Sequence, residues 1–178
     1  MADPEIIASG DWWSLDDAGT LRIFCVGNMP VSEWLGYSKK IRFVVISDGV
    51  TSISNSAFFR CYNLRSVTIP DGVTSIGNYA FYYCRDMEFT SVTLPDSLTS
   101  IGECAFCNCE NLTSVTTPAS LTTIGEYAFG DCSKLANAPI SDSVISIGPS
   151  AFRQCHSLTS VTIPQGVSAP YPSYAYRP

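Results

Sequence analysis

The stretch Ile76-Gly77-Asn78-Tyr79-Ala80-Phe81-Tyr82-Tyr83-Cys84 decides the fold, because its pattern Ile-x-x-x-Ala-Phe-x-x-Cys occurs five times in 178 residues. The five copies are Ile53–Cys61, Ile76–Cys84, Ile101–Cys109, Ile124–Cys132 and Ile147–Cys155. Successive cysteines lie 23, 25, 23 and 23 residues apart. A fixed period of this length, with apolar residues at fixed phases, is typical of a solenoid. A solenoid presents a repeated, extended surface rather than one enclosed pocket.

Each copy also carries a short polar–apolar alternation that predicts a β-strand. In Ser66-Val67-Thr68-Ile69 the alternation has period two, and Pro70 ends the strand because proline cannot donate to a continuing ladder. Equivalent blocks, each followed by proline, are Ser91-Val92-Thr93-Leu94, Ser114-Val115-Thr116-Thr117 and Ser160-Val161-Thr162-Ile163. Stacked copies are therefore expected to form a parallel sheet with strands about 4.8 Å apart.

The Ala-Phe half of each copy predicts one short helical or 3₁₀ turn on the side opposite the strands. Pro149 lies three positions before Phe152, where proline suits the first position of such a turn. We expect the repeated phenylalanines to form one internal column, made of Phe58, Phe81, Phe106, Phe129 and Phe152.

Two copies depart from the pattern. Two extra residues within 85–90 predict a bulge in one coil. In the fourth copy, Pro139 takes the exposed position that Thr68 holds in its own copy. Because proline removes a ladder donor, we expect an irregular strand there.

The two ends of the chain differ from the repeats. The segment Ile41–Ile46 predicts a half-copy whose outward residues, Phe43 and Val45, need cover that residues 9–36 are expected to supply. Trp12–Ile23 predicts a β-hairpin with its turn at Asp16–Gly19. We therefore divide the chain into an N-terminal hairpin cap at 1–40, repeats of about 23 residues at 41–168, and a degenerate C-terminal cap at 169–178.

The string Val67–Gly77, followed by Ala80-Phe81 and Cys84, closely resembles the BspA-like, or Treponema pallidum-type, leucine-rich repeats. The opening Trp13–Leu21 resembles the N-terminal cap of bacterial surface members of that family. The resemblance covers nearly the whole chain. It implies a right-handed leucine-rich-repeat solenoid of the α/β class, and adhesion or protein recognition at the surface of bacteria, with members also in protists.

Charge and composition exclude several function classes. The net charge is −6, and the ten Lys and Arg residues are scattered, so the chain lacks the basic stripe that nucleic-acid backbones or anionic membranes require. No apolar run approaches the roughly 18 residues that span a bilayer. The opening Met1–Glu5 does not have the composition of a signal peptide. An extracellular or cell-surface location is expected from the resemblance, and a cytoplasmic one if Met1 is the native start.

The cysteines and the single histidine are the candidate sites for chemistry. We expect the five repeat cysteines to be buried free thiols with parallel side chains. The group Cys104, Cys107 and Cys109 is best explained as variation on the convex side, with a metal site or a local disulfide as alternatives. A pair of Cys155 with His156 is not expected to be catalytic, because the cysteine should point inward with its column.

The acidic residues of the N-terminal hairpin do not form a recognisable metal motif. Asp11, Asp16 and Asp17 lack the Gly and Glu spacing of a calcium loop, so we interpret them as a solvated turn. We predict no catalytic residues, no metal and no cofactor.

Two surfaces are candidate binding sites. The first is the polar strand column of Ser66, Thr68, Ser91, Thr93, Ser114, Thr116, Ser160 and Thr162, although threonine is also an ordinary strand former. The second is the aromatic set of Tyr79, Tyr82, Tyr83 and Tyr127, because tyrosine is favoured at recognition surfaces.

The sequence therefore predicts a non-catalytic protein- or glycan-binding module that acts in adhesion or recognition at a bacterial cell surface. The alternative is a structural spacer or self-assembly scaffold that associates through the stack ends, where Tyr171, Tyr174 and Tyr176 lie. A hydrolase or redox enzyme ranks last. The sequence leaves the ligand, the binding face and the oligomeric state open.

Overall fold

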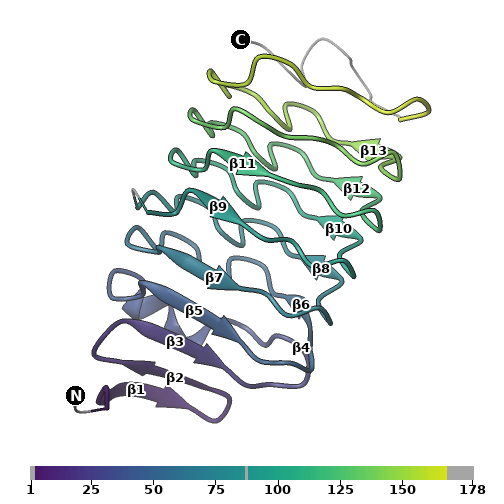
Figure 1. The fold of residues 1–178 in the computed structure, drawn as a ribbon. Coiled ribbons are helices and arrows are strands. Elements are labelled where there is room, and N and C mark those ends of the chain that lie inside the picture. The colour runs from purple at the N-terminus through teal and green to yellow at the C-terminus, as the bar shows by residue number, and fades with distance from the viewer. Residues whose placement is uncertain (1–2, 87, 168–178) are drawn as a thin grey trace.

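The computed structural model describes residues 3–86 and 88–167, which form a stack of similar coils (Figure 1). Each repeat coil contains a short strand or an extended segment, a corner, a second strand and a series of turns. The strand β1 lies at one end of the stack and β13 near the other. The architecture is a parallel β-solenoid extended by antiparallel strands at its N-terminal end.

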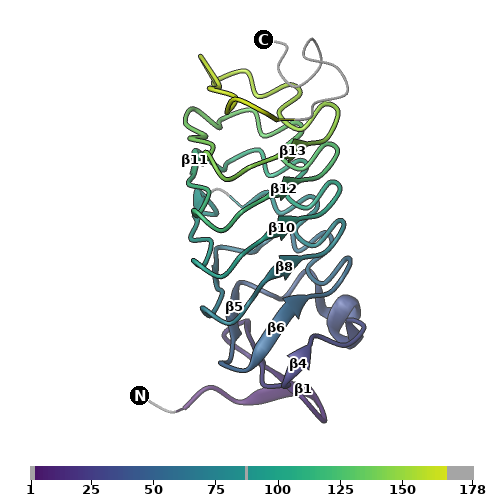
Figure 2. The ribbon, with the colours of Figure 1, turned by 90° about the vertical axis from the view of Figure 1, so that its right-hand side faces the viewer.

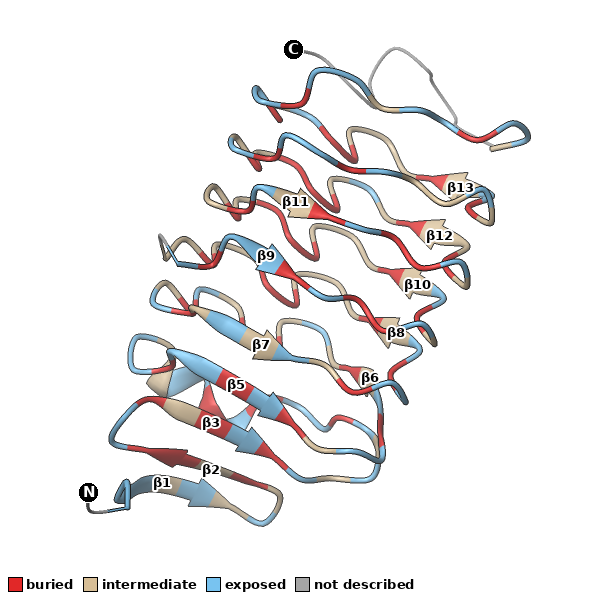
Figure 3. Ribbon diagram, viewed as in Figure 1, coloured by how far each residue is buried: buried red, intermediate tan, exposed pale blue. Residues whose placement is uncertain are grey.

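The first series of strands contains the predicted Ser/Thr strands. It comprises the five-stranded sheet β1 (Ile6–Gly10), β2 (Trp13–Asp16), β3 (Thr20–Ile23), β5 (Phe43–Ile46) and β7 (Ser66–Thr68), and a separate parallel pair, β9 (Ser91–Val92) and β11 (Ser114–Val115). The strands beginning at Ser66, Ser91 and Ser114 are therefore confirmed, although each is shorter than its four-residue block. Buried and exposed residues alternate along β5, as Figure 3 shows.

The strand predicted at 160–163 does not form, so this prediction was wrong. Its neighbour in the fourth copy is irregular, as expected, and keeps only one isolated bridge between Asn137 and Ser114. Pro139 has no N–H to offer, so the next coil finds no continuous ladder to extend.

A second series of strands, which the sequence analysis missed, runs along the adjoining side of the stack (Figure 2). Its six-stranded sheet contains β4 (Gly27–Asn28), β6 (Val50–Ile53), β8 (Ser75–Ile76), β10 (Ser100–Ile101), β12 (Thr123–Ile124) and β13 (Ser146–Ile147). The register places the isoleucine that opens each Ala-Phe motif above the one before it. These isoleucines are buried and form one wall of the core.

The Ala-Phe segments are not helical, so the predicted helical or 3₁₀ turns were wrong. Residues before the alanine and before the cysteine have left-handed backbone angles, for example Tyr79 with φ 59° and Tyr83 with φ 63°. Alternate N–H groups bond to the next coil, as Phe81 N does to Ala105 O at 2.7 Å. A helix would need those N–H groups for itself. The one 3₁₀ helix in the described ranges is η1 (Glu33–Tyr37), and no described helix is long and apolar enough to cross a membrane.

The phenylalanine column is confirmed. Neighbouring rings stack with centroids 5.0 to 5.4 Å apart, and each ring is 0 or 1% exposed. At the N-terminal end, Trp34 of η1 continues the column by stacking on Phe58 at 5.9 Å. The Trp34 indole N–H donates to Ala57 O at 2.6 Å. The tryptophan thus covers the open end of the apolar column.

The N-terminal strands β1, β2 and β3 add to the edge of the sheet beside β5 and do not cover its outer face. β2 and β3 pair antiparallel around a turn in which Gly19 N donates to Asp16 O at 3.0 Å, and β3 then pairs in parallel with β5. Phe43 and Val45 remain 36% and 39% exposed. The expectation that residues 9–36 cover these two side chains was therefore wrong, because backbone pairing places β3 beside β5 and not above it.

Asp16 is a buried structural carboxylate, so its interpretation as a solvated turn residue was wrong. Only 1% of its side chain is exposed. One oxygen accepts from Thr20 N at 2.7 Å and the other pairs with Arg22 Nη1 at 2.7 Å. Burial opposes ionisation, but the hydrogen bonds from Arg22 and Thr20 outweigh it and lower the pKa of Asp16.

Acidification should remove part of the stability that Asp16 provides. Because its pKa is lower in the folded state than the ordinary value of about 3.9, its contribution is complete above that value and is lost as the pH falls through the folded pKa. We expect Asp16→Asn to reduce the free energy of unfolding by about 1–2 kcal/mol at pH 7 and to weaken the loss of stability between pH 5 and pH 2. Urea unfolding at several pH values measures both effects.

The matched control is Asp48→Asn, because Asp48 is exposed and pairs with no described residue. The free energy of unfolding of this variant should lie within about 0.5 kcal/mol of the wild-type value. Equal unfolding curves for Asp16→Asn and Asp48→Asn at pH 7 would show that the buried carboxylate is not stabilising.

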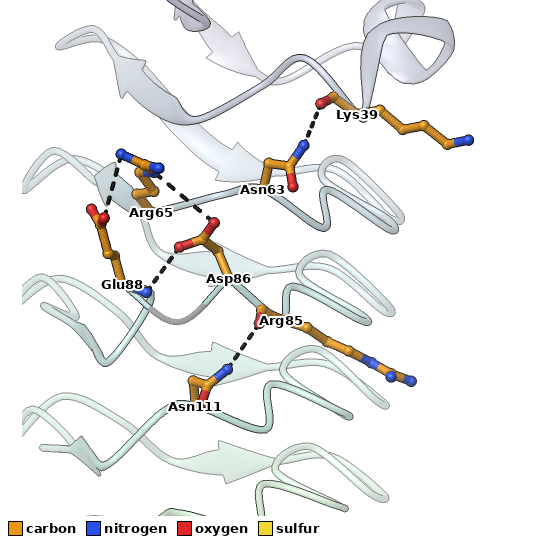
Figure 4. Close-up of polar contacts among 7 residues, drawn as sticks. All are labelled: Lys39, Asn63, Arg65, Arg85, Asp86, Glu88 and Asn111. Atoms are coloured by element: carbon orange, nitrogen blue, oxygen red, sulfur yellow. Dashed lines mark hydrogen bonds and ion pairs between the residues drawn. The ribbon is translucent and has the colours of Figure 1, made fainter.

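The two-residue insertion lies in an irregular loop between Cys84 and β9. Phe89 is fully buried there, in the place that Leu112 fills in the following copy. Arg65 reaches across from the previous coil to Asp86 and Glu88, at 3.9 and 3.4 Å (Figure 4). The loop thus keeps one apolar anchor and is held by ion pairs on its outer side.

Candidate interaction surfaces

The Ser/Thr face consists of Ser66, Thr68, Ser91, Thr93, Ser114 and Thr116. Strand pairing brings these residues into rows, with Ser66 beside Phe43, Thr68 beside Val45, and Ser114 beside Ser91. All are exposed except Ser114, which is half-buried. The outer face of the sheet is thus apolar toward the N-terminal end and hydroxyl-bearing further along the stack.

The face is hollowed between β9 and β11. A shallow depression of about 340 Å³ is lined by Ser91, Val92, Thr93, Leu94, Asp96, Ser114, Val115, Thr116 and Pro118. A second, of about 450 Å³, lies over 136–140 and 159–162 and includes Ser160 and Thr162. Asp96 is the only charged residue in either lining, and the sequence analysis did not single it out.

The hydroxyls of the Ser/Thr face differ from the other repeated hydroxyls. Thr99 and Thr122 each donate to a carbonyl of the preceding coil, at 2.9 and 3.0 Å. Ser97, Ser120 and Ser143 do the same at 2.6 to 2.7 Å. By contrast, no hydroxyl of the Ser/Thr face bonds to another described residue. These hydroxyls keep their full capacity to donate and accept.

The structure brings three of the four candidate tyrosines together. Tyr79 contacts Tyr82 with ring centroids 5.7 Å apart, and Tyr82 contacts Tyr83 at 4.6 Å. Phe59 stacks on Tyr82 at 5.2 Å, and Arg85 lies over Tyr83 at 4.1 Å. Phe59 and Arg85 were not among the residues predicted for this surface. Their place one period before or directly after the tyrosine-bearing motif could have identified them.

Two tyrosine hydroxyls are already engaged. Tyr79 donates to Glu103 Oε1 at 2.5 Å, and this hydrogen bond raises the pKa of Tyr79. Tyr127 is separate from the other three and accepts from Arg153 Nη1 at 3.0 Å. The aromatic set is therefore a half-buried packed cluster plus one isolated tyrosine, with less free hydrogen-bonding capacity than the Ser/Thr face.

The repeat cysteines are buried free thiols that help to join the coils, as expected of residues in the core. Cys109 donates to Phe81 O at 3.2 Å and Cys132 to Phe106 O at 3.1 Å. Cys155 donates to Phe129 O at 3.1 Å and points inward, whereas His156 is exposed. The two side chains therefore do not form a nucleophile–base pair. No group of three or more metal-ligating side chains occurs within 3–86 and 88–167.

These features define a class of protein: a parallel β-solenoid whose coils present periodic rows of side chains on extended faces. The family model described as BspA type Leucine rich repeat region (6 copies) matches residues 33–88 and 85–175. The chain belongs to this BspA-type leucine-rich-repeat family.

Solved structures of bacterial repeat proteins share the fold. A leucine-rich repeat protein from Eubacterium ventriosum has a TM-score of 0.75 and 28% identity over 86% of this chain and 42% of its own. The Treponema pallidum leucine-rich repeat protein has a TM-score of 0.66 and 31% identity, over 85% of this chain and 68% of its own. A leucine-rich cell surface protein from Faecalibacterium prausnitzii has a TM-score of 0.60 and 25% identity, over 90% of this chain and 55% of its own. No curated protein matches the chain significantly.

Proposed function

We propose that the protein is a non-catalytic binding module whose Ser/Thr face recognises a protein or a glycan. One observation carries this proposal: the exposed strand hydroxyls have no partner among the described residues, whereas the other repeated hydroxyls are used to join coils. A row of free donors and acceptors at fixed spacing suits an extended partner that offers hydroxyl or amide groups at intervals.

The depression between β9 and β11 supports the same face. Its lining combines the hydroxyls of Thr93 and Thr116 with apolar side chains, and Asp96 is its only charge. An uncharged, hydrogen-bonding partner fits this lining better than an anionic one. This favours a neutral glycan or an extended polypeptide segment.

We further propose that binding takes place at a bacterial cell surface, in adhesion or recognition. The similarity to the Faecalibacterium prausnitzii cell surface protein supports this location. The chain spans 42 to 68% of the three related structures, so a larger protein could present this module alongside further segments.

Binding should depend on the free hydroxyls and not on the engaged ones. We expect the wild type to bind a component of a glycan array or of a panel of immobilised mucin, fibronectin, collagen and laminin. The double variant Thr93→Val, Thr116→Val should bind this component about tenfold more weakly, because each lost hydrogen bond costs about 0.5–1.5 kcal/mol. Its unfolding midpoint should be unchanged. Biolayer interferometry and urea unfolding provide the two readouts.

The matched control is Thr99→Val, which removes a hydroxyl that donates to Thr74 O at 2.9 Å. This variant should lose about 1 kcal/mol of stability and keep its binding. Unchanged binding by the double variant would contradict the role of the face. A wild type that binds nothing at high concentration would favour the alternative, a spacer or scaffold, and sedimentation would then report self-association. The tyrosines named for that alternative lie outside the described residues.

A further inference from the structure

Cys104 and Cys107 differ from the buried cysteine column. They replace the tyrosines that stand at the same positions in the second copy, Tyr79 and Tyr82. Cys104 is half-exposed and Cys107 is 5% exposed, whereas Cys109 is fully buried in the column. A small molecule can therefore reach Cys104, whereas Cys107 is buried but does not belong to the core cluster.

The backbone holds the two cysteines at a disulfide-compatible separation. Cys107 N donates to Cys104 O at 3.1 Å, which closes a β-turn across Ala105 and Phe106. Such a turn keeps its first and fourth Cα atoms less than about 7 Å apart, and disulfides span about 4.4–6.8 Å between Cα atoms.

The side chains of Cys104 and Cys107 point to the same side of the turn. At the equivalent positions one coil earlier, the rings of Tyr79 and Tyr82 touch, with centroids 5.7 Å apart. Burial raises the pKa of both thiols, to about 12 for Cys107, and each thiol also perturbs the pKa of the other. The two thiols are therefore close enough to interact across the turn.

The surroundings favour two-sulfur chemistry over metal binding. Asn108 Nδ2 donates to Cys107 Sγ at 3.2 Å, which offsets part of the rise that burial causes in the pKa of that thiol. No further ligand joins the pair among the described residues, whereas zinc usually takes four. The neighbouring Cys109 thiol already donates a hydrogen bond to Phe81 O.

We propose that Cys104 and Cys107 form a redox-active pair that low-molecular-weight disulfides oxidise to an intramolecular disulfide. The more exposed Cys104 thiolate attacks one sulfur of the small disulfide, forms a mixed disulfide and releases one small thiol. Cys107, as its thiolate, then attacks Cys104 Sγ and releases the second small thiol. The protein loses two protons and two electrons, and the small disulfide takes up both to become two thiols.

The experiment treats the full chain with oxidised glutathione at pH 8 and then counts thiols in denaturant. The count should fall from eight to six, and the intact mass should fall by two hydrogens without an adduct. Peptide mapping should link Cys104 to Cys107. A count that stays at eight, or a glutathione adduct without an internal link, overturns the proposal.

Three variants assign the chemistry. Cys104→Ser should form no internal disulfide, and Cys107→Ser should retain one glutathione on Cys104 because the second attack is lost. Cys25→Ser removes the other half-exposed thiol and should still lose two thiols. An internal disulfide in Cys104→Ser, or none in Cys25→Ser, would overturn the assignment. Circular dichroism confirms folding, and the change at the half-exposed Cys104 keeps the test decisive if Cys107→Ser does not fold.

Discussion

Gly125→Ala should destabilise the protein by more than about 3 kcal/mol, because the coils approach too closely at this residue to admit a side chain. A Cβ atom at Gly125 would lie 2.5 Å from Gly102 C, 2.6 Å from Glu103 N and 2.7 Å from Gly102 O. All three are backbone atoms of the preceding coil, so no side chain can rotate away to make room.

The coils would have to separate at Gly125, which would weaken the hydrogen bond from Gly125 N to Ile101 O, now 2.8 Å. For a chain of this size, 3 kcal/mol corresponds to a fall in melting temperature of about 6–12 °C. Calorimetry or thermal circular dichroism measures this shift.

Gly36→Ala is the matched control, because a Cβ at Gly36 of η1 would meet no atom within 4 Å. Its melting temperature should match or slightly exceed that of the wild type, since alanine restricts the unfolded chain. Equal melting temperatures for Gly125→Ala and Gly36→Ala would show that the close approach of the coils does not explain why glycine follows isoleucine at this position.

Phe106→Ala should be comparably damaging, with a loss of about 3–5 kcal/mol. Phe106 is fully buried and stacks between Phe81 and Phe129, with centroids at 5.0 and 5.3 Å and planes within 5° and 1° of parallel. Alanine would leave a cavity in the middle of the column and remove both ring contacts, each of which adds about 0.5–1.5 kcal/mol.

The position of the Phe106 cavity should also show in hydrogen exchange. In a solenoid each coil is stabilised mainly by its two neighbours. We therefore expect amides on the C-terminal side of residue 106 to exchange faster in the variant, while those near Trp34 keep their protection. Uniform acceleration along the chain would indicate that the stack unfolds as one unit.

Phe59→Ala is the control for the Phe106 change, because Phe59 stacks on Tyr82 at 5.2 Å but is only half-buried. The same change of side chain should cost about 1 kcal/mol at this surface position. Equal losses for Phe59→Ala and Phe106→Ala would contradict the internal column as the main source of stability.

The sequence anticipated the candidate surfaces only in part. It identified the Ser/Thr column because alternation along a strand sets which side chains point outward. It could not show that the Thr93 hydroxyl is free while the Thr99 hydroxyl is bonded, since both are threonines in similar contexts. It also grouped Tyr127 with Tyr79, although Cys104 occupies the same position in the coil between them.

The register of the apolar residues was set by the sequence alone. A constant spacing puts Phe81, Phe106 and Phe129 at one phase of every coil, so their burial in a single column follows whatever the exact path of the chain. The same spacing anticipated the irregular fourth copy, because a proline at position 139 lacks the donor that a ladder requires.

Only the tertiary structure decided how the polar groups of each coil are used. The second sheet and the left-handed turns are held by hydrogen bonds between neighbouring coils. The side-chain bonds of Thr99, Cys109 and Ser120 likewise reach backbone carbonyls 22 to 28 residues away. The hydrogen bond from Cys107 N to Cys104 O also belongs to a turn that departs from the predicted helical form. Hydrogen bonds require defined positions of both partners, whereas burial requires only the right phase, and so the apolar core was predictable and the bonding of the polar groups was not.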